Sequence, residues 1–246
     1  MDVGILPADM PVNSGEAGGG TKFIAGYDQP GKAGGDSGPA TALGVFSGLK
    51  AAVKHRLGVD TTKGMRVAIQ GLGKVGMGVA KRLHAEGAKL IVADTNLKAV
   101  AEAVETLHAV AATPDQIVTC ECDVLSPNAL GAILNDQSIP RLSAKVVAGG
   151  ANNQLARDHH GAMLRDLGIL YAPDYVINGG GIIRVAAQIE NWSDEEVDRR
   201  VLAIAETLSA IFTRAAKDGE PTNVIADRMA EERIARGKGA AAKAAE

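Results

Sequence analysis

Three glycines in one short stretch constrain the fold of this 246-residue chain more than any other feature. Gly71, Gly73 and Gly76 follow the apolar run 67–69, and a helix is expected over 75–86. In a strand, turn and helix of this kind, the first glycine permits the tight turn and the second lets a pyrophosphate approach the backbone. The third lets the helix pack closely on the strand. The pattern therefore predicts a dinucleotide site.

An acid at the end of the next apolar run supports the same interpretation. Asp94 ends the run 89–94 and lies close to the roughly 20 residues beyond the glycines that such sites require. A carboxylate there can accept hydrogen bonds from the adenosine ribose and would repel a 2′-phosphate, so we expect NAD rather than NADP. The alternative is a tight strand–turn–helix corner with a capping Asp. The candidate cofactor residues are Gly71, Leu72, Gly73, Lys74, Val75, Gly76 and Asp94.

Strands and helices alternate through the middle of the chain. Apolar patterns predict strands at 67–69, 89–94, 117–119, 145–148 and 169–171, and helices at 41–57, 75–86 and 97–108. Such alternation with short connections is typical of a parallel sheet with right-handed crossovers. We therefore expect an α/β fold, a Rossmann-like doubly wound parallel sheet with C-terminal helices.

The last part of the chain is expected to be helical. Ser193 followed by Glu196 is typical of a capping box, and apolar residues then mark one face of a long helix to Phe212. Pro221 opens a last charged helix, and the tail from Gly237 is expected to fray.

Composition excludes several functional classes. A net charge of -3 argues against a nucleic-acid surface, and no run approaches the roughly 20 apolar residues that cross a bilayer. The chain has 30 Gly and only 3% aromatic residues, which suits helices packed closely on a sheet. Cys120 and Cys122 are too close in sequence for a structural disulfide or a four-ligand zinc site, so we expect a reducing cytoplasm.

No metal site is expected either. His159 and His160 are adjacent, and adjacent residues on a helix point in different directions. The sequence offers no evident third ligand for a metal held by these two histidines.

Seven segments resemble a known family. The chain is similar to the C-terminal part of the leucine, phenylalanine and valine dehydrogenases, NAD-dependent relatives of glutamate dehydrogenase, with leucine dehydrogenase the most similar. The matching segments are 38–45 (GPATALGV), 71–76 (GLGKVG), 122–124 (CDV) with 129–131 (ALG), 148–155 (AGGANNQL), 171–181 (YAPDYVINGGG) and 226–233 (ADRMAEER).

The resemblance implies an activity and an organisation. Members of this family deaminate an L-amino acid oxidatively, transferring hydride to NAD and releasing a 2-oxo acid and ammonia. They are homo-oligomers of two-domain subunits with the active site between the domains. Two lysines on the N-terminal domain bind the substrate carboxylate and activate water, the second lysine having a lowered pKa.

The start of this chain departs from that pattern. Asp2 matches the catalytic Asp of the family, but the segments that carry both lysines precede it in the family and are absent here. Lys22 is the alternative candidate, although it follows the Asp rather than preceding it. We therefore expect a truncated enzyme with residues 1–37 as a remnant of the substrate domain, 38–192 as the NAD-binding domain and 193–246 as C-terminal helices.

The resemblance also assigns roles in the cleft. Thr41 and Asn152 correspond to residues that contact or orient the nicotinamide, and Ala148 ends a strand where ligands bind in such sheets. Without the resemblance, Thr41 would be a helix cap and the Asn152 region a turn. Ile182 and Val185 would line the substrate pocket and leave a carboxylate unpaired, which disfavours glutamate. The alternative for both aliphatic residues is core packing.

Two functional hypotheses follow. The first is an NAD-dependent dehydrogenase of branched-chain or aromatic L-amino acids, for which this chain supplies the cofactor domain. The second is a catalytically incomplete NAD-binding remnant that acts as a binding or assembly module. A third possibility keeps the fold and changes the reaction to that of another NAD-linked oxidoreductase.

Overall fold

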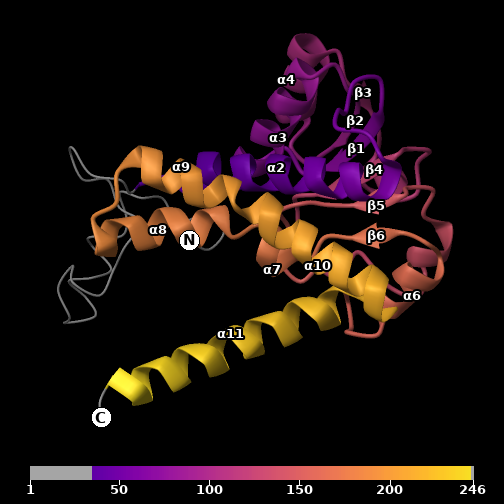
Figure 1. The fold of residues 1–246 in the computed structure, drawn as a ribbon. Helices are drawn as coiled ribbons and strands as arrows, with labels where there is room; N and C mark the ends of the chain where they lie inside the picture. The colour runs from indigo at the N-terminus through magenta and orange to yellow at the C-terminus, as the bar shows by residue number, and fades with distance from the viewer. Residues whose placement is uncertain (1–34, 245–246) are drawn as a thin grey trace, which may run out of the picture.

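The computed structural model describes the backbone of residues 35–244 and the side chains to residue 237 (Figure 1). The candidates Asp2 and Lys22 lie outside the described residues. No helix of the described part is both long and apolar enough to cross a membrane.

A six-stranded parallel sheet forms the centre of the chain, in the order β3-β2-β1-β4-β5-β6. This order confirms the predicted doubly wound α/β fold. The strands are β1 (Arg66–Gln70), β2 (Lys89–Ala93), β3 (Val110–Ala111), β4 (Val124–Pro127), β5 (Val146–Val147) and β6 (Leu170–Tyr171).

Alternate residues of the strands face two separate cores, as a period of two requires. Val67 and Ile69 of β1 pack with α2 (Gly38–Leu57), α3 (Lys74–Ala85) and α4 (Leu97–Leu107) on one face. Ala68 packs on the other face against α5 (Pro114–Ile117), the 3-10 turn η3 (Ile139–Arg141) and α6 (His160–Asp166). Because both faces are covered, the central strands are continuous apolar runs.

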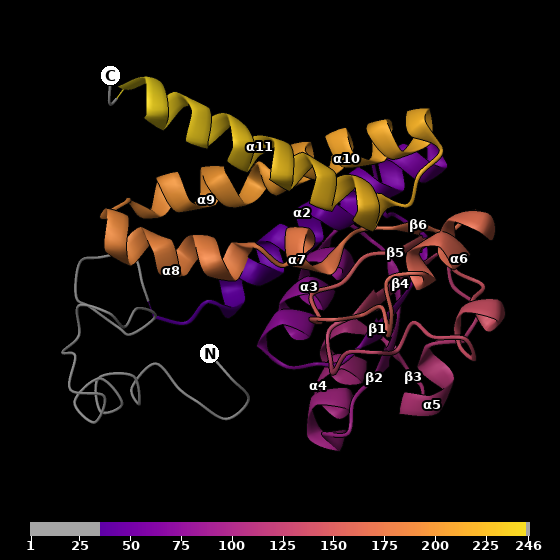
Figure 2. The same cartoon turned by 90° about the horizontal axis from the view of Figure 1, so that it is seen from below.

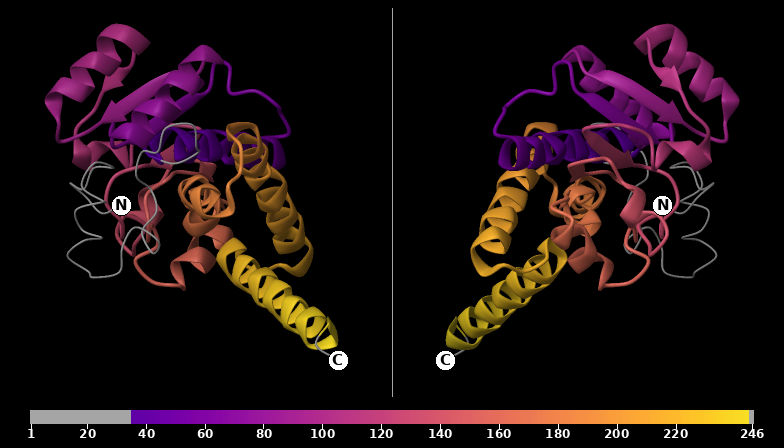
Figure 3. Two further views of the ribbon diagram at one scale, coloured as in Figure 1. Left: turned by 90° about the vertical axis from the view of Figure 1, so that its left-hand side faces the viewer. Right: turned by 90° about the vertical axis from the view of Figure 1, so that its right-hand side faces the viewer.

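Four of the five C-terminal helices pack on α2, whereas the last one packs on the helix before it, on α6 and on the edge strand β6 (Figure 2). The five helices are α7 (Asp174–Ile177), α8 (Gly180–Glu190), α9 (Asp194–Leu202), α10 (Ile204–Asp218) and α11 (Thr222–Ala244). Gly44 and Gly48 of α2 allow these helices to approach it closely. A Cβ on Gly48, for example, would lie 2.6 Å from the Leu208 side chain and 2.7 Å from that of Ile177. The last helix, α11, packs through its first turns and then projects away from the body (Figure 3).

The prediction of a strand at 117–119 is wrong. Thr113 and Gln116 form a capping box around Pro114, so this segment starts the short helix α5. Ile117 is fully buried, and its apolar neighbourhood fits a buried helix as well as a strand. The sheet instead contains β3 before this segment and β4 after it, and neither strand was predicted.

The long helix predicted after Ser193 is divided. Ser193 accepts a hydrogen bond from the Glu196 N–H, as expected of the cap, but α9 ends at Leu202 and α10 begins at Ile204. The break brings both Val201 and Ile204 against Gly44 of α2. The backbone of α11 stays helical to Ala244, past the point at which we expected fraying.

The glycine contact on α2 gives a stability test. Gly48→Ala is expected to lower the free energy of unfolding by about 1–3 kcal/mol, because the added methyl overlaps Leu208 and Ile177. Gly237→Ala on α11 is the matched control, since a Cβ there meets nothing within 4 Å and alanine favours helix. Urea denaturation of both variants checks this, and equal stability of the two would contradict the packing argument.

Candidate cofactor cleft

The three glycines of the loop after β1 have distinct environments. Gly71 has φ 90°, and a Cβ on it would lie 2.7 Å from the Asn128 carbonyl. A Cβ on Gly76 would lie 1.9 Å from the Gly71 oxygen, whereas one on Gly73 would meet nothing within 4 Å. Only glycine therefore fits at Gly71 and Gly76, while the backbone at Gly73 is open to an incoming group.

The amino end of α3 faces this loop. Gly73 is the N-cap and provides no side chain to accept from the first N–H groups of the helix. Those N–H groups, on Lys74, Val75 and Gly76, and the helix dipole together favour a bound anion. Leu72 is nearly buried and anchors the turn.

Asp94 is tied to the same loop. Its Oδ2 accepts from the Leu72 N–H at 2.5 Å and its Oδ1 from the Asn96 N–H at 2.7 Å. The cap of α4 is Asn96, whose side chain accepts from the Lys98 N–H, so Asp94 is not the helix cap of the alternative interpretation. The Asp94 carboxylate is held at the carboxyl end of β2, and it is only partly buried.

An ion pair joins the loop to the start of α2. Lys74 Nζ lies 3.0 Å from Asp36 Oδ2, and Asp36 Oδ1 accepts from the Gly38 N–H at 2.9 Å. Partial burial raises the pKa of Asp36, but the hydrogen bond from Gly38 and the nearby Lys74 outweigh it, so the pKa lies below its usual value. We use the name cofactor cleft for the carboxyl edge of the sheet between the loop 71–76 with Asp94 and the loop 149–154. The end of it near α3 holds Lys74 and the carboxylates of Asp36 and Asp94.

Amides and a hydroxyl line the other end of the cleft. Asn178 Nδ2 donates to Asn152 Oδ1 at 2.5 Å, and Asn128 Oδ1 accepts from the Gly150 N–H at 2.9 Å. Thr41 is buried at the start of α2, and its hydroxyl donates to the Ser37 carbonyl.

The neighbouring loop completes this end. Ala148 is fully buried at the end of β5. Asn153 has φ 52°, in the left-handed region that asparagine tolerates in turns, so it shapes the backbone of this loop.

The two ends of the cleft meet at Gly150. A Cβ there would lie 3.0 Å from Val75 of the phosphate loop and 3.1 Å from Asn128. Sequence reasoning missed Asn128 because it follows β4, which was placed in the wrong segment. It missed Asn178 although the glycines at 179–181 after it marked a tight connection.

The proposed substrate residues lie further along α8. Ile182 is 69% exposed, and it borders a groove of about 450 Å³ between α8 and α9 with Trp192 and Arg199. Val185 is half-buried on the same helix. The start of α8 approaches Thr41 closely, since a Cβ on Gly181 would lie 2.9 Å from the Thr41 hydroxyl. The described contacts do not bring Ile182 or Val185 to Asn152.

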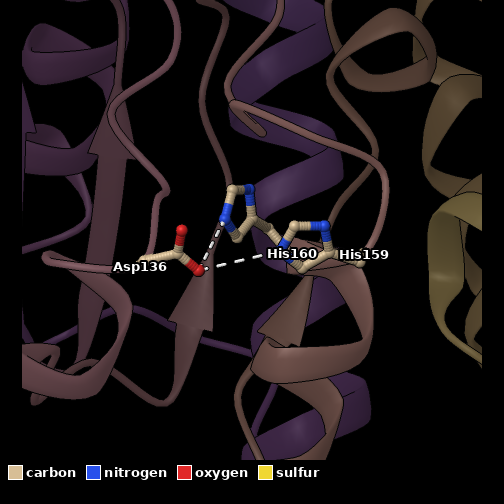
Figure 4. Close-up of side chains that lie close together, drawn as sticks. All are labelled: Asp136, His159 and His160. Carbon is tan, nitrogen blue, oxygen red and sulfur yellow. Dashed lines mark hydrogen bonds and ion pairs between the residues drawn. The ribbon is translucent and has the colours of Figure 1, made fainter.

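The two histidines expected to diverge in fact converge on a carboxylate (Figure 4). The rings of His159 and His160 are 4.2 Å apart, and Asp136 Oδ1 lies 3.7 Å and 3.4 Å from their Nε2 atoms. His160 Nδ1 accepts from the Arg157 N–H at 2.9 Å. Nδ1 is therefore unprotonated, so a neutral His160 carries its proton on Nε2.

That proton location opposes metal binding at the cluster. A histidine that binds a metal through Nε2 needs a proton on Nδ1, which it usually donates to an acceptor. Here the Nε2 proton points at Asp136, and the hydrogen bond from His160 lowers the pKa of that carboxyl. The absence of a metal stays a prediction, now with a structural reason.

The described cysteines are both free. Burial raises the pKa of the Cys122 thiol to about 12. Cys122 lies just before β4, at the amino ends of the strands, while the cofactor loop lies at their carboxyl ends. It therefore takes no part in the cleft.

Comparison with known proteins gives one consistent result. The family model for Glutamate/Leucine/Phenylalanine/Valine dehydrogenase matches residues 34–96 and 92–241. Leucine dehydrogenase from Bacillus cereus is 47% identical over 95% of this chain, which spans 63% of that relative.

Solved structures agree with the family match. The crystal structure of L-tryptophan dehydrogenase from Nostoc punctiforme has a TM-score of 0.81 and 42% identity, covering 83% of this chain and 62% of that one. Hetero-hexameric glutamate dehydrogenase from Thermus thermophilus has a TM-score of 0.74 at 26% identity, covering 95% and 62%.

The histidine cluster yields a direct test. Zinc at a twofold excess is expected to leave the melting temperature unchanged, because His160 Nε2 carries a proton. Nitrogen-15 NMR should show His160 Nδ1 unprotonated at pH 8. A zinc-induced rise in melting temperature that disappears in His160→Gln would show that the ring can release its bond to Arg157 and bind metal.

Proposed function

This chain belongs to the Glutamate/Leucine/Phenylalanine/Valine dehydrogenase family, and we propose that it provides the NAD-binding domain for oxidative deamination of a branched-chain or aromatic L-amino acid. In that reaction the amino acid loses a hydride and a proton to become an imine. Water then converts the imine into a 2-oxo acid and ammonia. Dehydrogenases of this family use NAD, which accepts the hydride when bound.

The loop after β1 supports NAD binding most strongly. The backbone at Gly73 is open, while Gly71 and Gly76 fit only without side chains. In this proposal the first N–H groups of α3 bind the pyrophosphate, with Lys74 adding a positive charge. The free side of the Asp94 carboxylate accepts from the adenosine ribose, and its charge disfavours a 2′-phosphate.

The opposite end of the cleft suits the nicotinamide. Asn152 is exposed on the loop after β5, and Thr41 lies at the start of α2. Neutral donors and acceptors of this kind can orient the nicotinamide ring by hydrogen bonds to its carboxamide group. In this proposal Asn152 contacts the ring at the carboxyl end of β5, while Ala148, which is fully buried, packs beneath the site and does not touch the ring.

The substrate class rests on relatives and on α8. The relatives are named leucine, L-tryptophan and valine dehydrogenases. Ile182 and Val185 are aliphatic and would leave a substrate carboxylate unpaired, so we propose an aliphatic or aromatic side chain rather than that of glutamate. The exposure of Ile182 is consistent with a side chain that becomes buried when a ligand or a neighbouring domain binds.

A second candidate function is a binding or assembly module that holds NAD without turnover. The described side chains at the nicotinamide end are Thr41, Asn128, Asn152 and Asn178, and none of these four is a general base near neutral pH. Acid–base chemistry would then depend on Asp2, Lys22 or a separate lysine-bearing domain.

We also propose a cytoplasmic oligomer, in line with the hetero-hexameric Thermus thermophilus relative.

Asp94 gives the test of cofactor binding. Asp94→Asn is expected to weaken NAD binding by about 1–3 kcal/mol, through loss of a charge-assisted hydrogen bond. The same variant should narrow the preference for NAD over NADP. Isothermal titration calorimetry measures both, with Glu102→Gln on exposed α4 as the control acid. An unchanged NAD dissociation constant would remove Asp94 from the site.

Turnover separates the two candidate functions. NADH formation with leucine, valine or phenylalanine is expected to be only at trace level for the 246-residue chain alone, because none of the four described side chains at the nicotinamide end is a general base. Rates like those of a full-length leucine dehydrogenase would contradict this expectation. Asp2→Ala and Lys22→Ala would then identify the group responsible.

A further inference from the structure

A buried polar network lies beneath the loop 149–154. Gln154 is fully buried, and Tyr171 and Asp174 are 3% and 7% exposed. Burying polar groups is costly unless they are hydrogen-bonded, and paired buried groups hold one another in one arrangement. The donors of this network are paired, whereas Gln154 Oε1 is buried without a partner among the described residues. This network therefore determines the shape of whatever it contacts.

Gln154 closes the loop upon itself. Its Nε2 donates to the Gly149 carbonyl at 2.7 Å and to the Ala151 carbonyl at 3.0 Å. Both amide protons of one side chain are thereby used on the two carbonyls that flank Gly150. The loop cannot change its curvature without breaking one of these bonds.

Asp174 attaches the closed loop to the body. Its Oδ2 accepts from the Gln154 N–H at 3.1 Å and its Oδ1 from the Tyr175 N–H at 2.9 Å. The Asp174 N–H donates to the Tyr171 hydroxyl at 3.2 Å. No ion pair of the described residues includes Asp174, so backbone N–H groups satisfy its oxygens.

The short helix α7 provides the fixed point. It begins at Asp174 and ends at Ile177, whose side chain is fully buried against Gly48 of α2. Because Ile177 holds this turn against α2, the hydrogen bond from the Gln154 N–H to Asp174 fixes the loop relative to α2. Asn152 lies on that loop, two residues before Gln154.

We propose that Asp174 and Gln154 are positioning residues that set the loop 149–154 so that Asn152 meets the nicotinamide half of NAD. This inference rests on the proposed function, because it assumes that the cleft binds NAD. Neither side chain touches the cofactor, and both act through the backbone of the loop. Their effect is therefore confined to one half of the dinucleotide.

ADP-ribose separates the two halves, because it carries the adenosine and pyrophosphate but lacks the nicotinamide. Gln154→Met removes both amide protons at similar volume, and Asp174→Asn keeps one acceptor and the packing. Each is expected to weaken NAD binding about 5- to 10-fold, as loss of one hydrogen bond implies. ADP-ribose binding should change by less than about twofold, with Asp174→Asn milder than Asp174→Ala.

Thr62→Val is the matched control. Thr62 is also fully buried and its hydroxyl donates to Glu86, but it lies before β1 at the amino end of the strands. It should lower the melting temperature without changing the ratio of the NAD and ADP-ribose dissociation constants. Amide hydrogen exchange at 150–154 should accelerate in the Gln154 and Asp174 variants and not in this control.

The outcomes are distinguishable. Equal weakening of NAD and ADP-ribose binding would mean a general stability role and overturn the inference. Wild-type protein that binds NAD no more tightly than ADP-ribose would also overturn it, since the nicotinamide would then contribute nothing. Wild-type protein that binds neither would overturn the proposed function itself.

Discussion

The burial of α2 between the sheet and the C-terminal helices is the interaction on which the other parts depend. Its small residues let both layers approach, since a Cβ on Gly44 would lie 2.9 Å from the Ile204 side chain and one on Gly48 would lie 2.6 Å from that of Leu208. Ile177 of α7 enters the second of these contacts, so the turn that carries Asp174 is located by the same packing. The amino end of α2 reaches the cofactor loop through Asp36. One helix thus positions both halves of the cleft.

The chemistry of the cleft is divided along its length. The end near α3 holds charged groups and free helix N–H groups, which suit a pyrophosphate and a ribose. The end near β5 holds amides and a hydroxyl on loops that follow strands, as expected where ligands bind in open α/β sheets. Gly150 is the junction, because its missing side chain lets the loop after β5 contact Val75 of α3. The division explains why a dinucleotide, with one charged and one neutral half, fits this cleft.

Local patterns predicted much of the fold, and they failed where one pattern fits two structures. The run before Gly71 and the run ending at Asp94 are strands, and the glycine loop after the first and the acid at the end of the second distinguished them from short buried helices. The segment at 117–119 is apolar and short as well, but the capping box at Thr113 made it helical. His159 and His160 were expected to diverge, yet their rings lie 4.2 Å apart and both side chains reach Asp136, a residue that no local pattern places beside them.

The sequence by itself determined the doubly wound sheet, the glycine loop and the acid that follows it, because turn geometry and residue periodicity are local properties of the chain. Tertiary structure decided which side chains complete the cleft. Asn128 follows β4, whereas Asp174 and Asn178 come from α7 and its C-cap, about 50 residues further along the chain, and residue periodicity alone marks none of the three as part of a ligand site. Their roles arise from strand order and from the packing of α7 on α2, which juxtapose them only after the chain has folded.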